Sequence, residues 1–200
     1  MNLPPRSAMR NVAIAALTLA ASAAQAHTGH ANSGLFEGLS HPLGLDHLLA
    51  MLAVGVWSVA ALPSDKTAWG PITFLLALLA SAALGVTGVT LPWQEQLISL
   101  SVVLFGLMLL FAKQRLPMAV GLGLIAAAAT LHGLAHGAEA PPTGLAAYAM
   151  GFILTTTALH FCGVAAAQAL RRFLASRVQW AIGSLGLLLS GSGAYLFSQL

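Results

Sequence analysis

Histidine and aspartate side chains occur within stretches of the sequence that are otherwise strongly apolar. His41, Asp46 and His47 lie close together in one such stretch, and His132 and His136 lie four residues apart in another. Residues four apart lie on the same face of a helix, so both imidazoles of the second pair can point at one ion. Imidazole and carboxylate ligands suit Ni²⁺, Co²⁺, Zn²⁺ or Cu²⁺ better than Mg²⁺ or Ca²⁺. The spacing therefore predicts a transition-metal site, in which Asp46 either binds the ion or orients an imidazole.

His160 lies in a later apolar stretch. Ionisable residues inside a membrane are costly to bury, and by default they mark a function. His27 and His30 precede the apolar stretches, and they form either a solvated tail or a collector of metal ions. The predicted metal ligands are His41, Asp46, His47, His132, His136 and His160.

The composition indicates that lipid surrounds these residues. Of the 200 residues, 58% are hydrophobic and only 6% are charged, whereas soluble domains carry about 25% charged residues. A water-facing surface cannot be built from so few charges. We therefore predict an all-α, polytopic membrane protein.

The N-terminus has the features of a secretory signal peptide. Arg6 and Arg10 precede an apolar run, Val12–Ala21, which is too short to span a bilayer. Small residues at positions 24 and 26 then form a cleavage site. We expect residues 1–26 to be removed.

The remainder, residues 27–200, is predicted to be a single domain formed by a bundle of six transmembrane helices. A spanning helix needs about 20 mostly apolar residues, and the connections between the apolar stretches are short and contain proline or charge. The six predicted helices are Leu43–Leu62, Gly70–Thr90, Gln96–Ala112, Pro117–His136, Gly144–Leu170 and Val178–Leu200.

The basic residues predict how these helices are oriented. With the mature N-terminus outside, every lysine and arginine after the signal falls in a loop on the inner side, as the positive-inside rule requires. These residues are Lys66, Lys113, Arg115, Arg171, Arg172 and Arg177. The basic excess is thus explained by topology and gives no support to nucleic-acid binding. We expect a multi-pass protein of the bacterial inner membrane with both mature termini in the periplasm.

This topology also predicts the depth of each candidate ligand. The first and fourth helices place their histidines near the outer surface, whereas His160 lies about 24 Å along the fifth helix. An outer cluster followed by a deeper residue is the layout expected of an inward ion path. The first three helices would be inverted relative to the last three, as in many transporters.

Two other functions also fit the residues. A zinc-dependent intramembrane hydrolase could use His132 and His136 to bind its metal, with Ser40 as a polar partner. A haem-binding electron carrier could use paired histidines, although ligands gathered at one depth disfavour it. The sequence leaves open whether the chain forms a homo-oligomer.

Three segments resemble one known family. The segment His41–Gly55 (HPLGLDHLLAMLAVG) is similar to the signature of the HupE/UreJ nickel permeases, and His132–Gly137 and Leu159–Gly163 resemble later motifs of that family. The resemblance implies a permease, not an enzyme, that carries nickel or sometimes cobalt for hydrogenase or urease maturation. It assigns metal roles to the six predicted ligands and implies no prosthetic group, because the ion is cargo.

Overall fold

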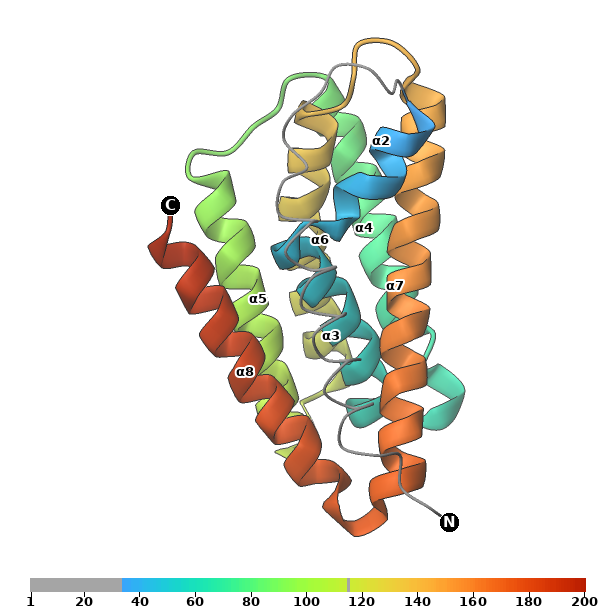
Figure 1. Ribbon diagram of the computed structural model, residues 1–200, viewed down its shortest axis with the longest axis vertical. Coiled ribbons are helices and arrows are strands. Elements are labelled where there is room, and N and C mark those ends of the chain that lie inside the picture. Colours follow the sequence, from blue (N-terminus) through green and yellow to red (C-terminus); the bar gives the residue numbers. More distant parts are fainter. Residues whose placement is uncertain (1–33, 115) are drawn as a thin grey trace, which may run out of the picture.

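The computed structural model describes residues 34–114 and 116–200. The predicted signal peptide, His27, His30 and Arg115 lie outside these residues. Every regular element in the described chain is a helix, as predicted (Figure 1). The α-helices are α2 (Leu35–Ser40), α3 (Leu45–Ala61), α4 (Trp69–Val86), α5 (Gln94–Leu110), α6 (Met118–Ala138), α7 (Leu145–Leu174) and α8 (Val178–Ser198). Short 3₁₀ turns are η1 (His41–Leu43), η2 (Ser64–Lys66), η3 (Ala112–Gln114) and η4 (Ala175–Arg177).

The six long helices α3 to α8 correspond to the six predicted stretches, with shifted ends. In the second stretch, α4 ends at Val86 rather than at Thr90. The chain turns there at Gly88, whose φ of 89° lies in the left-handed region that glycine adopts readily. In the fifth stretch the helix continues to Leu174, beyond the predicted end at Leu170.

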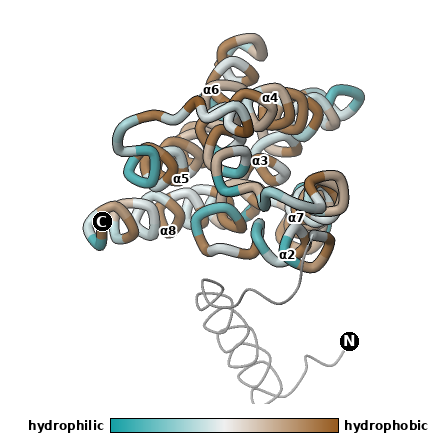
Figure 2. Tube along the Cα trace, turned by 90° about the horizontal axis from the view of Figure 1, so that it is seen from above, coloured by the Kyte–Doolittle hydropathy of each residue, from teal (hydrophilic) through white to brown (hydrophobic). Residues whose placement is uncertain are grey.

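Helix α3 is the central element of the bundle. The other long helices surround it when the bundle is viewed from above (Figure 2), and it packs directly against α4, α5 and α7. From Leu48 onwards its sequence is apolar except for Ser58, as expected for a helix without a solvent-facing side. Seven consecutive residues, from Ala53 to Val59, are buried.

Glycines allow the helices to pack closely in pairs. Gly55 of α3 lies against Gly163 of α7, and Gly85 of α4 lies against Gly137 of α6. A Cβ atom added at Gly137 would lie 2.8 Å from the Cα atom of Gly85. Small residues at such crossings let backbones approach in lipid, where the hydrophobic effect does not drive helices together.

The pairing of the helices has a two-fold character. The principal contacts are α3 with α7, α4 with α6, and α5 with α8. If α3, α4 and α5 are exchanged with α6, α7 and α8 in order, the first two pairs interchange and the third maps onto itself. Since α3 and α6 run in opposite directions (Figure 1), this pattern supports the prediction of two inverted halves.

The outer surface of the bundle is apolar, which suits contact with lipid. Large side chains are exposed on several helices, including Leu76, Phe161 and Leu188, each more than 60% exposed. Exposed apolar surface of this extent indicates an interaction with another molecule or a membrane.

Among the described residues, three helical stretches are long and apolar enough to cross a membrane: Ser64–Val86, Met118–Ala138 and Leu145–Ser198. The segment Leu35–Leu43 and helix α3 meet at an angle of 75°, and they form a fourth candidate if they are counted together as one broken span. The stretch Leu145–Ser198 contains both α7 and α8, which run in opposite directions (Figure 1). Helix α5 is apolar but shorter, so the six crossings predicted from the sequence stay a prediction.

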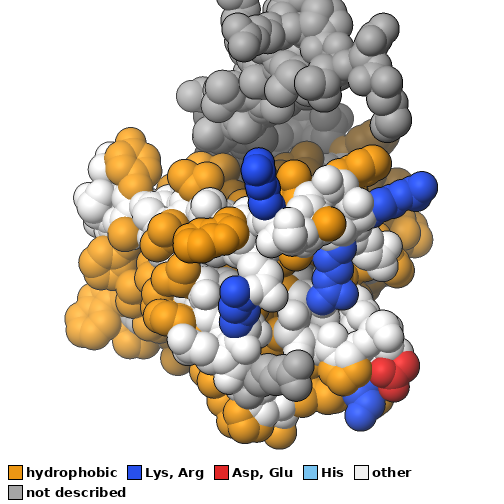
Figure 3. Space-filling model, turned by 90° about the horizontal axis from the view of Figure 1, so that it is seen from below, with side chains coloured by type: hydrophobic (Ala, Val, Ile, Leu, Met, Phe, Trp, Pro, Cys, Tyr) orange, Lys and Arg blue, Asp and Glu red, His pale blue; other side chains and the backbone are white. Residues whose placement is uncertain are grey.

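Charged side chains are separated between the two ends of the bundle. Lysine and arginine side chains gather on the face seen from below (Figure 3), with one acidic residue among them. The described basic residues lie in the connections η2, η3 and η4 and in the last turn of α7. Glu37, Glu95 and Glu139 lie in α2, at the start of α5 and at the end of α6, which are at the opposite end (Figure 1).

Candidate metal centre

A break between α2 and α3 brings the first group of predicted ligands together. Pro42 lies in the first turn of η1, and Gly44 has an extended ψ of 140° that interrupts the helical path. The chain bends by 75° at this point. The rings of His41, before the break, and His47, after it, have centroids 6.1 Å apart.

The predicted start of this helix, at Leu43, is two residues too early. Ser40 is the last residue of α2, its hydroxyl donates to the carbonyl of Glu37, and α3 begins only at Leu45. The serine hydroxyl is satisfied within its own short helix, and no side chain caps α3.

The last turns of α6 bring two more histidines to the same place. The ring of His136 has its centroid 4.6 Å from that of His41 and 4.6 Å from that of His47. The ring of His132 lies 4.7 Å from that of His47. The prediction that the two histidine pairs lie at similar depth is therefore confirmed. We call His41, His47, His132 and His136 the outer cluster.

Asp46 orients the ring of His47. One carboxylate oxygen, Oδ1, lies 2.8 Å from both the backbone nitrogen and Nδ1 of His47. Because a carboxylate accepts hydrogen bonds, the proton of the neutral imidazole lies on Nδ1. The other nitrogen, Nε2, is buried, has no hydrogen-bond partner and carries a lone pair. Metal-binding histidines are commonly oriented in this way by a carboxylate.

Ser101 of α5 sets the tautomer of His132. Its hydroxyl lies 2.7 Å from the carbonyl of Ile98 and 2.9 Å from Nε2 of His132. When the hydroxyl donates to the carbonyl, it accepts from Nε2–H of His132, and the lone pair of the ring is then on Nδ1. That nitrogen is also buried without a partner, and the whole residue has no exposed surface.

His160 follows the same pattern deeper in the bundle. Its Nδ1 donates to the carbonyl of Thr156 at 2.7 Å, which leaves a lone pair on the unpartnered Nε2. His136 differs, because neither of its ring nitrogens has a hydrogen-bond partner. Buried polar atoms are rarely left unpaired in proteins. Four histidines with unpaired ring nitrogens thus fit a cation better than they fit a simple packing role.

The rings are not arranged as a closed chelate. Within the residues that the structure describes, no group of three or more His, Cys, Asp or Glu side chains is placed so that it could hold one metal ion. The rings of the outer cluster contact one another edge to face. A shared ion would therefore require imidazoles to rotate about their side-chain bonds.

Phe74 of α4 lies between the outer cluster and His160. Its ring centroid is 5.8 Å from that of His132 and 4.9 Å from that of His160. The side chain is fully buried. The ring of Phe74 thus contacts both a histidine of the outer cluster and His160.

Sequence reasoning missed several residues that contact the predicted ligands. A carboxylate oxygen of Glu139 lies 3.2 Å from Nε2 of His41, and its position three residues after His136 in an otherwise apolar segment could have indicated it. Ser101 and Phe74 carry no such signal, because each meets the histidines through contacts between different helices.

Comparisons with known proteins give a family match over most of the chain. Residues 15–196 match the family described as HupE / UreJ protein. The chain is 38% identical over 158 residues to Protein HupE of Rhizobium leguminosarum bv. viciae, which covers 78% of this chain and 81% of that protein. No solved structure matches the chain significantly. The family is associated with nickel and cobalt transport for hydrogenase and urease, and its members are permeases or accessory proteins rather than enzymes. With a match over most of its length, the chain belongs to the HupE/UreJ family.

Proposed function

We propose that this protein carries a divalent transition metal ion, Ni²⁺ or Co²⁺, across the bacterial inner membrane into the cytoplasm. The cargo would supply the maturation of a hydrogenase or urease. The observation that carries the proposal is the set of buried, unpartnered ring nitrogens on His47, His132, His136 and His160. A neutral imidazole with its other nitrogen hydrogen-bonded is the form that binds such ions.

In this proposal the outer cluster receives the ion first. His41 is the most exposed of the four histidines, with 20% of its side chain accessible, and the carboxylate of Glu139 beside it is 49% accessible. His47, His132 and His136 lie behind His41 and are buried. Asp46 acts by orienting His47 and by contributing negative charge. His160 would receive the ion after it passes Phe74.

The membrane potential can drive this movement. A dication that crosses an inside-negative potential of 100 mV gains about 4.6 kcal/mol. This free energy supports an accumulation of roughly a thousandfold. The proposal therefore needs no nucleotide-driven step.

Substitutions in the outer cluster and at His160 should affect Ni²⁺ uptake and Ni²⁺ binding differently. Replacing His47 or His132 by alanine should lower both Ni²⁺ binding and Ni²⁺ uptake. His160→Ala should lower uptake more than binding, because the outer cluster stays complete. Uptake of radioactive Ni²⁺ and Co²⁺ in cells without other importers, with calorimetry on the purified variants, measures both. Cys162→Ala on the same helix is a control, because Cys162 is exposed on the outer surface.

A double variant tests whether the outer histidines share one ion. If they do, His47→Ala combined with His132→Ala should bind Ni²⁺ little worse than either single variant, since effects within one unit are not additive. Additive losses would mean two separate ions. Loss of all binding in His160→Ala, with none lost in His132→Ala, would place the main site at His160 and refute the outer-cluster proposal.

A further inference from the structure

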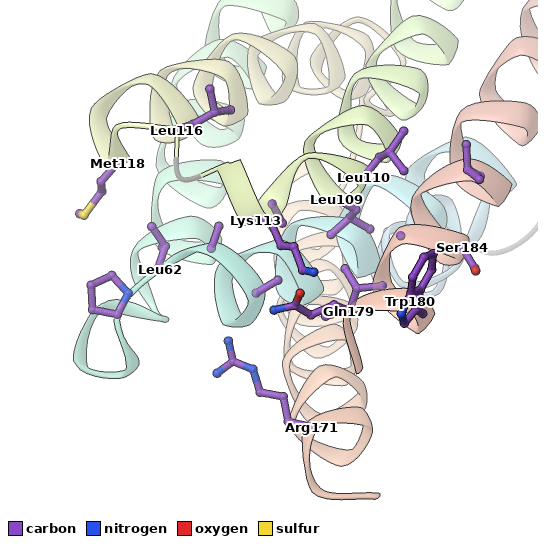
Figure 4. Close-up of a pocket in the computed structure, with 17 residues that line it drawn as sticks. Leu62, Leu109, Leu110, Lys113, Leu116, Met118, Arg171, Gln179, Trp180 and Ser184 are labelled. Atoms are coloured by element: carbon purple, nitrogen blue, oxygen red, sulfur yellow. The ribbon is translucent and has the colours of Figure 1, made fainter. Parts of the chain in front are cut away.

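A cavity of about 930 Å³ lies at the basic end of the bundle, away from the histidines. It is bounded by the end of α3, the end of α5, the beginning of α6 and the first turns of α8 (Figure 4). Its volume is within the range of about 300–1,000 Å³ that is usual for small-molecule sites. No residue of the outer cluster lines it.

The rim of the cavity is positively charged and polar. The amino group of Lys113 points towards the side chain of Gln179, and the guanidinium group of Arg171 faces both of them across a gap (Figure 4). Arg171 is held in place because it donates a hydrogen bond to the carbonyl of Val59 near the end of α3. Two cations at one opening repel a metal dication, so this cavity is not suited to the ion path, but they attract an anion.

The inner wall of the cavity is apolar. Leu62, Leu109 and Ile182 form part of it and are at least 93% buried. The outer side is formed by Trp180 and Leu187, which are 80% and 60% exposed on the outer surface of the bundle. The cavity thus combines an apolar wall that is continuous with the apolar outer surface and a basic rim at the end of the bundle where the basic residues gather.

We propose that this cavity binds an anionic phospholipid, with its phosphate between Lys113 and Arg171 and part of an acyl chain against the exposed apolar side chains of Trp180 and Leu187. A free phosphate ion would use the basic rim but would leave the apolar wall unfilled. Basic sites between transmembrane helices at the cytoplasmic side are suited to anionic headgroups. Each basic residue near such a headgroup contributes about a fivefold gain in affinity.

The rim is tested by removing its two charges. Native mass spectrometry of the full-length protein in detergent, with added phosphatidylglycerol or phosphatidylcholine, measures bound lipid directly. We expect phosphatidylglycerol to bind more tightly than phosphatidylcholine to the unaltered protein. The double variant Lys113→Gln with Arg171→Gln should bind phosphatidylglycerol about 25-fold more weakly. Arg172→Gln with Arg177→Gln is the matched control, because it removes the same charge from residues outside the cavity.

The wall is tested without changing any charge. Gly183 of α8 lines the cavity, and a Cβ atom added there would have its nearest neighbour, Leu110, at 3.9 Å. Gly183→Leu therefore has room to fold while its side chain fills the cavity, and it should lower phosphatidylglycerol binding at least tenfold. Gly191→Leu on the same helix is the control, because an added Cβ there meets nothing within 4 Å and Gly191 does not line the cavity.

Three results would overturn the proposal. Equal loss of binding in the Arg172/Arg177 control would mean diffuse attraction to the basic face. Unchanged binding in Gly183→Leu would mean that no acyl chain occupies the cavity, and this variant decides the matter even if Arg171→Gln fails to fold. Displacement of the bound lipid by millimolar inorganic phosphate would identify free phosphate as the ligand.

Discussion

At the scale of single residues, hydrogen bonds determine which ring nitrogen of a histidine carries the proton and which carries the lone pair. Asp46, Ser101 and the carbonyl of Thr156 each accept the proton of one histidine, and the opposite ring nitrogen is then left unprotonated and unpartnered. The three acceptors come from three different helices. Losing any one of these hydrogen bonds would change which ring nitrogen carries the proton, although the histidine itself is unchanged.

Replacing Ser101 by alanine tests this arrangement. The Nε2–H of His132 would lose its acceptor, and the ring could then turn or place its proton on Nδ1. We expect Ni²⁺ affinity to fall about tenfold, the lower end of the range for partners that orient a metal-binding histidine. Calorimetric titration of the purified variant measures the loss. Ser99→Ala is the control, because Ser99 is also buried in α5, and an equal loss there would refute the role of Ser101.

Protons should compete with the metal for these nitrogens. A free imidazole has a reference pKa of about 6.5, and it must be neutral to bind a metal ion. We therefore expect the initial rate of Ni²⁺ uptake, at limiting Ni²⁺ and fixed membrane potential, to fall as the external pH drops below about 6. A rate that rises steadily towards pH 5 would indicate instead that coupling to protons dominates.

The sequence identified the histidines but could not identify what orients most of them. Apolar surroundings and spacing were sufficient to select His47, His132 and His160, because a titratable side chain in a membrane helix is rare. The contact between Asp46 and His47 could also be anticipated, because the two residues are adjacent in the sequence. The contact between Ser101 and His132 could not, since serine is common in membrane helices and the two residues belong to different helices.

At the scale of elements, the positions of the ligands depend on one helix break and on close helix pairing. The long helices could be predicted because runs of apolar residues and their short polar connections are visible along the chain. The short helix α2 could not, since its apolar residues are too few to give a membrane-helix signal and its position depends on packing against α7. Gly38 of α2 makes that contact against Gly151.

The importance of glycine pairing can be measured by making the same glycine-to-alanine substitution at a close helix contact and at an open position. Gly85→Ala would place a methyl group 2.9 Å from Gly137, so we expect a loss of about 1–3 kcal/mol from overpacking. Gly123→Ala on α6 meets nothing within 4 Å and should be neutral or stabilising by up to about 1 kcal/mol. Thermal unfolding of the solubilised variants compares the two. Equal melting temperatures would show that the α4–α6 approach is not tight.

At the scale of the whole molecule, the separation of charge suggests one orientation in the membrane. The described basic residues lie at the end of the bundle that carries η2, η3 and η4, and the outer cluster lies in the other half, near the end of α6. Under the positive-inside rule the outer cluster would face the periplasm. An ion from outside would then meet the histidines before it meets any basic residue.

Reporter fusions test this orientation. An enzyme that is active only in the periplasm should be active when it is fused after Leu200, because both mature termini are predicted to lie outside. The same reporter should be inactive after Lys113 or Arg172. Activity at these two internal positions, without activity at the C-terminus, would show that the orientation is reversed.

The meeting of α3 and α6 at the outer cluster also has a consequence for the electrostatics of the backbone. The C-terminal end of α6 presents carbonyl groups with a partial negative charge of about one half of an elementary charge, which favours a cation beside His136. The N-terminal end of α3 presents the opposite partial charge beside His47, and Asp46 lies in that first turn. The carboxylate therefore offsets an amide dipole that would repel the ion, in addition to orienting the imidazole. Asp46→Asn would remove the negative charge while preserving the size of the side chain and an oxygen that can still accept a hydrogen bond from His47.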